Sequence, residues 1–157
     1  MAYYTTVSSP LGEITLLSRD GKRLSGLWLK TQNPQTDGAE RNDAPEIFRL
    51  TEDWLTRYFA GQKPVCGEIP LSPAGTDFQM RVWERLCMIP YGGTVSYGQI
   101  ADEIGCRSAQ AVGQAVGRNP VSIIVPCHRV IGKNGSLTGY AGGLEYKREL
   151  LKLEGLL

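Results

Sequence analysis

The first third of the chain carries the pattern of β-strands. Residues 3–8, 13–18 and 24–29 are rich in β-branched, aromatic and leucine side chains. Turn-forming sequences separate them, with Ser-Pro-Leu-Gly at 9–12 and Asp-Gly at 20–21. Because short turns connect neighbouring antiparallel strands, we expect an antiparallel meander at the start of the chain.

A helical pattern follows a polar stretch. Residues 31–45 are rich in Asn, Gln, Asp, Gly and Pro and show no period, which is typical of a surface loop. Within residues 46–60, apolar side chains then recur on one face at helical spacing, namely Ile47, Leu50, Trp54, Leu55 and Tyr58. Gly61 is placed to end this helix. A short strand near residues 65–69 would complete a small α/β unit, and residues 71–75 are predicted to form a linker.

Helices dominate the second half of the chain. Thr76 and Gln79 form a capping box at the start of one helix. The apolar residues of that helix recur at a spacing of four, as Phe78, Val82 and Leu86. This pattern predicts a helix that ends before Pro90, and the leucines within residues 144–153 predict another at the end of the sequence.

Two shorter helices lie between these. The first is expected over about residues 97–104, the second runs from an N-cap at Ser108 to about Arg118, and Gly-Cys-Arg at 105–107 joins them. So tight a connection indicates a helix-turn-helix, although most helical hairpins bind no DNA. Small side chains on the second helix either pack closely in the core or let its backbone approach a partner surface: Ala109, Ala111, Gly113, Ala115 and Gly117.

Length and composition favour a chain that folds on its own. It has 157 residues, enough for one core or two small subdomains, of which 41% are hydrophobic and 21% charged, as is typical of globular proteins. No apolar run approaches the roughly 20 residues that cross a bilayer, and the first ten residues lack the layout of a signal peptide. We therefore expect a cytoplasmic protein with no membrane partner.

Charge is balanced overall but not along the chain. The net charge is +1, yet residues 104–144 contain no Asp or Glu. The basic side chains of this stretch are Arg107, Arg118, Arg129 and Lys133. Strong DNA binders make about six to ten phosphate contacts, so this positive field is modest. A stretch that lacks acids without binding anything remains the alternative.

The cysteines do not form a metal-binding pattern. They lie about twenty residues apart, at positions 66, 87, 106 and 127, and the only histidine is His128. Zinc ligands normally come in pairs at short spacing. We therefore expect no metal and no cofactor.

The candidate chemistry lies in Pro-Cys-His-Arg at 126–129. It follows the apolar run 121–125, which is bounded by prolines and expected to be a buried extended segment. Proton acceptors and cations beside a thiol favour the nucleophilic thiolate. An isolated Cys-His pair is more often a buried structural thiol beside a hydrogen-bonded histidine. The residues alone therefore make Cys127 a candidate nucleophile and no more.

The motifs around this cysteine resemble a known family. Asn-Pro at 119–120, Pro-Cys-His-Arg-Val at 126–130 and Gly-Tyr-Ala-Gly-Gly at 139–143 are similar to the signature of the O6-alkylguanine-DNA alkyltransferases. The resemblance covers residues 76–155 in spacing and residue type, and residues 1–70 only through the order of elements.

The resemblance implies an α/β (α+β) fold in two domains. Residues 1–74 would form a ribonuclease H-like scaffold of antiparallel sheet and helix. Residues 75–157 would form a mostly helical, winged-helix-like domain that contains the helix-turn-helix, binds DNA and accepts the alkyl group.

It also implies DNA repair by direct reversal of damage. Cys127 would take the alkyl group from O6-alkylguanine, and also from O4-alkylthymine, in duplex DNA by in-line displacement, and would keep it, so that each molecule acts once. The damaged base would be flipped out of the stack from the minor groove. A monomer without cofactor is expected.

The resemblance assigns the catalytic roles residue by residue. His128 would take the thiol proton through a water, and Glu154 would orient His128. Asn119 would tie adjoining turns together beside Cys127.

A second set of residues would bind the substrate base. The Tyr140 hydroxyl and the Ala141 backbone N–H would stabilise the leaving guanine, and the Val130 carbonyl would accept from its exocyclic amine. Val116 and Ser122 would shape the space for the alkyl group.

A third set would bind DNA. Tyr97 would displace the target phosphate, and Gln110 stands where many members have an arginine that fills the vacated stack. Glutamine lacks the charge and the planar guanidinium of that arginine, so base flipping is expected to be less efficient. The other implied contacts are Ala109, Gly113, Arg118 and Arg129.

Two other functions stay open. A module that recognises alkylated guanine without reacting would share the fold, and Cys127 argues against it because such relatives lack the reactive cysteine. A cysteine hydrolase or thiol oxidoreductase for small molecules would need only the Cys-His pair. The sequence offers it neither a nearby resolving cysteine nor a clear oxyanion motif.

Overall fold

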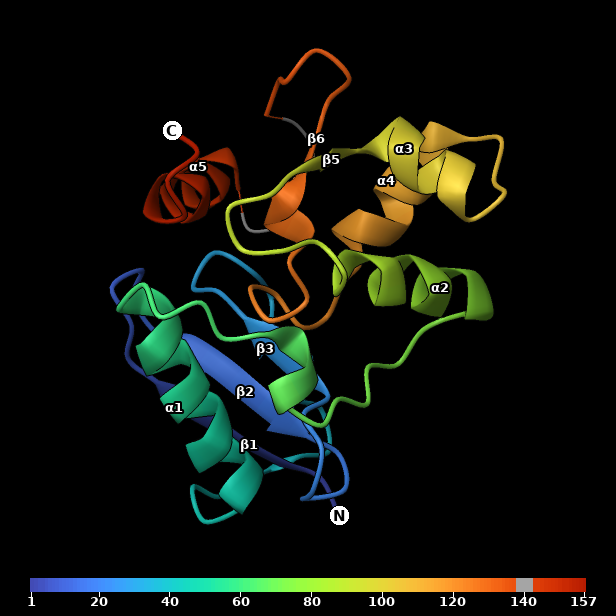
Figure 1. Cartoon of the computed structure of the whole chain (residues 1–157). Helices are drawn as coiled ribbons and strands as arrows, with labels where there is room; N and C mark the ends of the chain where they lie inside the picture. Colours follow the sequence, from blue (N-terminus) through green and yellow to red (C-terminus); the bar gives the residue numbers. More distant parts are fainter. Residues whose placement is uncertain (138–142) are drawn as a thin grey trace. The chain divides into compact units, whose positions relative to one another are not determined.

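The chain forms two compact units, seen in a computed structural model that describes residues 1–137 and 143–157 (Figure 1). One unit contains Met1–Ala74 and Pro120–Ser122, and the other contains Gly75–Asn119 and Ile123–Leu157. The mixed α/β composition confirms the predicted fold class.

The sheet of the first unit begins as a meander. Strands β1 (Tyr3–Val7) and β2 (Ile14–Ser18) pair antiparallel, and β3 (Gly26–Trp28) adds antiparallel to β2, which confirms the prediction. A fourth strand, β4 (Glu40–Arg41), pairs parallel with β1 inside the stretch predicted to be only a loop. Both of its residues are exposed and are held by backbone hydrogen bonds, so no apolar side chain marks this strand in the sequence.

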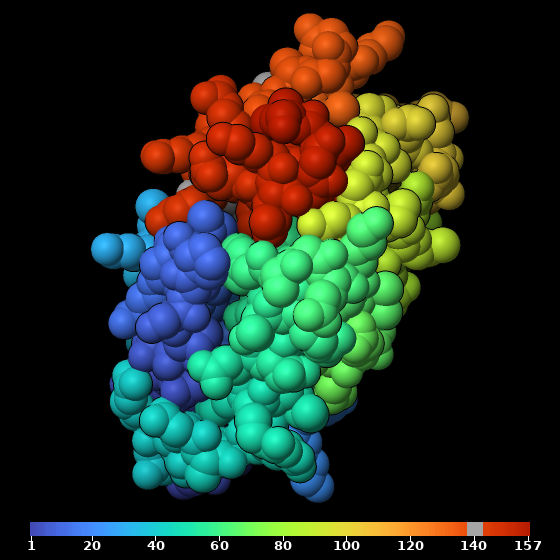
Figure 2. All heavy atoms as spheres, turned by 60° about the vertical axis from the view of Figure 1, so that its left-hand side comes forward, coloured from blue at the N-terminus to red at the C-terminus, as the bar shows by residue number. Residues whose placement is uncertain are grey.

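Helix α1 (Glu46–Phe59) confirms the predicted helix, and Gly61 follows it with φ +81°. Its buried side is Ile47, Phe48, Thr51, Trp54, Leu55 and Tyr58, and its opposite side lies on the surface, in the turquoise to green region of Figure 2. Leu50, expected on the buried face, is 42% exposed. Thr51 takes that place instead, because its hydroxyl donates to the Ile47 carbonyl at 2.8 Å and so loses no hydrogen bond by burial.

The strand predicted near residues 65–69 is wrong. The chain forms the 3-10 helix η1 (Cys66–Glu68) there. The Glu68 carboxylate accepts from the Val65 N–H at 2.8 Å and from Arg57 at 2.9 Å. These side-chain bonds hold a turn where the apolar residues by themselves suggest a strand.

The second unit begins with α2 (Asp77–Leu86), whose start confirms the predicted capping box. The Thr76 hydroxyl accepts from the Gln79 N–H at 3.1 Å, and the Gln79 side chain accepts from the Thr76 N–H at 3.0 Å. The helix buries Val82, Trp83 and Leu86.

Helices α3 (Tyr97–Glu103) and α4 (Ala109–Gly117) confirm the two predicted short helices and their tight connection (Figure 1). Ser96 and Ser108 each accept a hydrogen bond from an N–H in the first turn of the helix that follows, at 3.1 and 3.0 Å. Gly105 has φ +71° in the connection, a conformation that L side chains rarely adopt.

Short strands and a last helix complete this unit. Strand β5 (Val95–Ser96) pairs parallel with β6 (Val130–Ile131), which brings the chain just after Cys127 beside the start of α3. Helix α5 (Leu144–Leu153) confirms the predicted last helix, and Glu154 is its C-cap residue. Within the described residues, no helix is long and apolar enough to cross a membrane.

Candidate active site

The apolar run before Cys127 is buried, but it is not extended. Val121 forms a single bridge with Leu27 in the first unit, and the chain then turns, with Ile123 at φ +70°. All five residues of the run are at most 2% exposed. An apolar run indicates burial but does not fix the backbone conformation, which is why the extended prediction failed.

Cys127 lies in the turn that follows, the 3-10 helix η2 (Cys127–Arg129). The residue is 4% exposed. The Asn119 side chain donates to the Val125 carbonyl at 2.8 Å and so ties the end of α4 to the chain just before the cysteine. The supporting role that the resemblance implies for Asn119 stays a prediction.

A buried acid holds the histidine beside Cys127. His128 Nε2 and Glu154 Oε2 are 2.6 Å apart, and both side chains are fully buried. The same carboxylate accepts from Arg129 Nε at 2.8 Å, Arg129 Nη2 at 3.1 Å and the Gly92 N–H at 3.0 Å. Burial alone would raise the pKa of Glu154, but the hydrogen bonds and charges of His128 and Arg129 lower it to about 2.

Burial determines the charge of His128, and the ionised acid determines which ring nitrogen carries the proton. Burial lowers the pKa of His128 below its usual 6.5, and the contact with Glu154 opposes only part of that shift. The ring is therefore neutral at neutral pH. Because an ionised carboxylate can only accept, Nε2 carries the ring proton and Nδ1 is the basic nitrogen.

Arg129 points into the protein, although the sequence resemblance implies a DNA contact for it. The side chain is buried, donates to Glu154, and donates from Nη1 to the Ile89 carbonyl at 2.7 Å. Its guanidinium also lies 5.8 Å from the Tyr91 ring. Charge in a sequence does not give the direction of a side chain, and the DNA contact of Arg129 stays a prediction that its burial does not support.

A buried lysine was missed by sequence reasoning. Lys147 on α5 is fully buried, donates from Nζ to the Val130 carbonyl at 2.6 Å and lies 5.9 Å from the Tyr97 ring. Burial lowers its pKa to about 8, and negative charge at Cys127 opposes that shift. One signal was present: Lys147 precedes the buried Leu150 and Leu151 by three and four residues, so it shares their helix face.

Comparisons with known proteins agree with this geometry. The ribonuclease-like domain of 6-O-methylguanine DNA methyltransferase matches residues 2–73, and the DNA-binding domain of the same protein matches residues 77–156. The chain belongs to the 6-O-methylguanine DNA methyltransferase family. This confirms the family that the Cys127 motifs indicated.

Relatives cover the chain almost from end to end. The methylated-DNA--protein-cysteine methyltransferase of Mycobacterium tuberculosis is 48% identical over 98% of this chain and 93% of its own length, and that of Methanosarcina barkeri is 47% identical over 97% and 96%. A crystal structure of Mycobacterium tuberculosis OGT in complex with DNA superposes with a TM-score of 0.88 at 47% identity, over 97% of this chain and 92% of that one.

The other site residues predicted from the methyltransferase family fall into three groups. Ala109, Gln110 and Arg118 are exposed at α4, and Gly113 of that helix faces the Tyr97 ring. Val116 is buried, and Ser122 lies in the first unit, where it donates to Gln32 at 3.1 Å. Tyr140 and Ala141 lie outside the described residues. The roles of all these residues stay predictions.

Proposed function

We propose that this protein repairs DNA by moving an alkyl group from the O6 oxygen of guanine to the sulfur of Cys127, once per molecule. The observation that carries the proposal is the buried contact between Glu154, at the end of α5, and His128, which lies in the turn that contains Cys127. Cys127 is then the nucleophile, His128 the base, and Glu154 the group that orients the base. Membership of the methyltransferase family supports the same reaction.

The reaction proceeds as a displacement. His128 takes the proton of the Cys127 thiol at Nδ1, through a water, while Glu154 stabilises the imidazolium. The thiolate attacks the alkyl carbon, so that the S–C bond forms as the C–O6 bond breaks. The departing guanine takes up a proton, which leaves intact guanine in the DNA and a thioether on the protein.

The buried Lys147 favours the same step. Its pKa responds to negative charge at Cys127, so its cation in turn attracts charge to that sulfur. Its bond to the Val130 carbonyl also holds the turn that contains the thiol. The carbonyl keeps a second lone pair for the exocyclic amine of guanine.

The partner is DNA, in the form of a duplex that contains O6-alkylguanine, and O4-alkylthymine is a second substrate. The match of residues 77–156 to a DNA-binding domain supports this partner. The base is flipped out toward Cys127 from the minor groove, with Tyr97 and Gln110 assisting. We also propose that residues 1–74 act as a scaffold, and that the protein acts as a cytoplasmic monomer without cofactor.

Mass spectrometry of the reacted protein tests the proposal. The protein is incubated with a duplex that contains O6-methylguanine, digested, and searched for added methyl groups. We expect one methyl group on Cys127, and none in a Cys127→Ser variant that still binds the duplex. Tight binding without modification would identify a non-reacting recognition module, and indifference to the DNA would favour a small-molecule activity of the thiol.

A further inference from the structure

The loop between α2 and β5, residues 87–94, contacts the end of α5 where the buried acid lies. The Gly92 N–H donates to Glu154 Oε1 at 3.0 Å, and a Cβ atom at Gly92 would lie 3.6 Å from the Glu154 carbonyl oxygen. One residue earlier, the Tyr91 hydroxyl donates to the Leu153 carbonyl at 3.2 Å. Two consecutive loop residues therefore hold two consecutive residues at the end of α5.

The same loop also holds the cation that shares the acid. Arg129 donates from Nη1 to the Ile89 carbonyl at 2.7 Å, and its guanidinium carbon lies 5.8 Å from the centre of the Tyr91 ring. A cation at this distance is attracted to an aromatic ring. Because Arg129 bonds to both carboxylate oxygens of Glu154, a side chain that holds Arg129 also holds the acid. Tyr91 thus acts on Glu154 by two routes, the helix end and the guanidinium.

The hydroxyl of Tyr91 is suited to this contact. Burial raises the pKa of Tyr91 above its usual 10, and the negative charge of Glu154 raises it further, so the phenol keeps its proton and donates. The last carbonyls of a helix have no partner within the helix. Three of those in α5 accept from the N–H groups that follow, namely Leu150, Leu151 and Lys152. The fourth, that of Leu153, accepts from Tyr91.

We propose that Tyr91 is a positioning residue for the base of the transfer reaction and that it acts through Glu154. The inference rests on the proposed function, in which Nδ1 of His128 accepts the thiol proton because the acid holds the ring proton on Nε2. A carboxylate that is free to move away from Nε2 no longer selects this tautomer, and it stabilises the imidazolium less.

Tyr91→Phe tests the hydroxyl and keeps the ring. We expect the reaction with free O6-benzylguanine to slow by about three- to tenfold, the range that corresponds to one hydrogen bond of ordinary strength. The contact with Glu154 raises the pKa of His128. Nitrogen-15 NMR of the variant should therefore show the ring titrating at a pH about 0.5 lower than in the parent, with part of the population carrying its proton on Nδ1 at pH 7.

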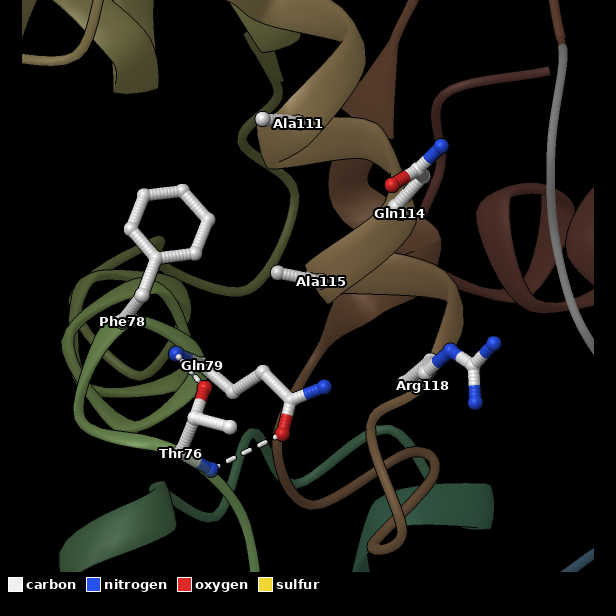
Figure 3. A pocket seen from close by; sticks show the side chains of 7 residues that line it. All are labelled: Thr76, Phe78, Gln79, Ala111, Gln114, Ala115 and Arg118. Atoms are coloured by element: carbon white, nitrogen blue, oxygen red, sulfur yellow. Dashed lines mark hydrogen bonds between the residues drawn. The ribbon is translucent and has the colours of Figure 1, made fainter.

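Tyr91→Leu tests the ring as well. It removes the hydroxyl and the aromatic face beside Arg129, so we expect a loss of about tenfold or more in the same reaction. Its matched control is Phe78→Leu, which removes another half-buried ring from the same unit. Phe78 lines a pocket of about 200 Å³ between α2 and α4 (Figure 3). Tyr3→Phe, in the first unit, is the control for Tyr91→Phe.

The NMR spectrum distinguishes a positioning role from a purely structural one. Both controls should keep the tautomer and the titration of His128 as in the parent, with rates within about twofold. A Tyr91→Phe variant with the parent's rate, tautomer and titration would overturn the proposal. So would a slower variant whose His128 ring titrates as in the parent, because Tyr91 would then support the fold without acting on the base.

The two readouts also separate this inference from the proposed function. A parent protein that free O6-benzylguanine fails to alkylate at Cys127 contradicts the proposed function. The NMR comparison of the parent with Tyr91→Phe needs no reaction, so it still tests whether Tyr91 sets the state of His128. If the parent is alkylated and the spectra of the two proteins agree, the proposed function stands and the role of Tyr91 does not.

Discussion

Two polar regions of the second unit use similar side chains in opposite ways. Glu154, at the end of α5, is buried and bonded to the buried His128 and Arg129 of η2. Along α4, Gln110 and Arg118 are exposed to solvent. The first region uses its charges to fix a proton acceptor, whereas the second leaves its polar groups available to a partner. A basic residue in the sequence therefore indicates a DNA contact only if the structure shows that its side chain is exposed.

The largest expected effect comes from breaking the buried region. Glu154→Ala leaves the Arg129 guanidinium buried without its counter-ion, which should lower the free energy of unfolding by about 3–5 kcal/mol. Urea denaturation measures this change. Glu149→Ala, which removes an exposed acid from the same helix, is the control and should change stability by less than about 0.5 kcal/mol. Similar losses in the two variants would show that Glu154 is not the centre of the network.

The pH dependence of stability gives the next largest effect. Because the folded pKa of His128 is lowered from 6.5, the unfolded chain takes up the proton first as pH falls. The contribution is complete above about pH 6.5 and is lost below it, by at most about 2 kcal/mol between pH 7 and 5. Glu154 acts in the same direction only below its unfolded value of 4.5.

A His128→Asn variant isolates this contribution, because His128 is the only histidine. Thermal unfolding of the parent and the variant at pH 7 and 5 should show a smaller loss in the variant. An equal loss would place the acid sensitivity elsewhere.

Lys147→Met separates stability from reaction within the buried region. Replacing a buried charge with an apolar side chain of similar length should leave stability within about 1 kcal/mol or raise it. Loss of the cation near Cys127 and of the bond to Val130 should slow transfer to the thiol by about tenfold or more. Stopped-flow kinetics with free O6-benzylguanine measures the rate, and an unchanged rate would reduce Lys147 to a packing role.

The smallest effect is expected on the exposed helix. Gln110→Arg supplies the charge and planar group that many family members have at this position, and should leave duplex repair equal or up to a few-fold faster. The reaction with the free base should not change, because no base is flipped. A comparable gain on the free base would contradict a flipping role for Gln110.

The parts of the fold that short-range signals control could be predicted. The capping box at Thr76, the N-cap at Ser108 and the apolar face of α1 each specify a helix within a few residues of sequence. Strand β4 depends on backbone pairing with β1, and η1 on side-chain bonds to Glu68, so neither shows an apolar period.

The candidate site also has a part that could be predicted from the sequence and a part that could not. The Cys127 motif could be recognised from its residues, because residue type and spacing carry the resemblance. The inward direction of Arg129 and the burial of Lys147 depend on how α5 packs against the η2 turn. Those contacts join residues far apart in the sequence, and no local pattern reveals them.

The central claim is that His128 is a neutral base held by an ionised Glu154. Nitrogen-15 NMR of protein labelled at histidine observes this ring alone, since the chain has a single histidine. We expect a neutral ring at pH 7 with its proton on Nε2, and a protonation midpoint below the usual histidine pKa of 6.5. A ring that is charged at pH 7, or that carries its proton on Nδ1, would contradict the account.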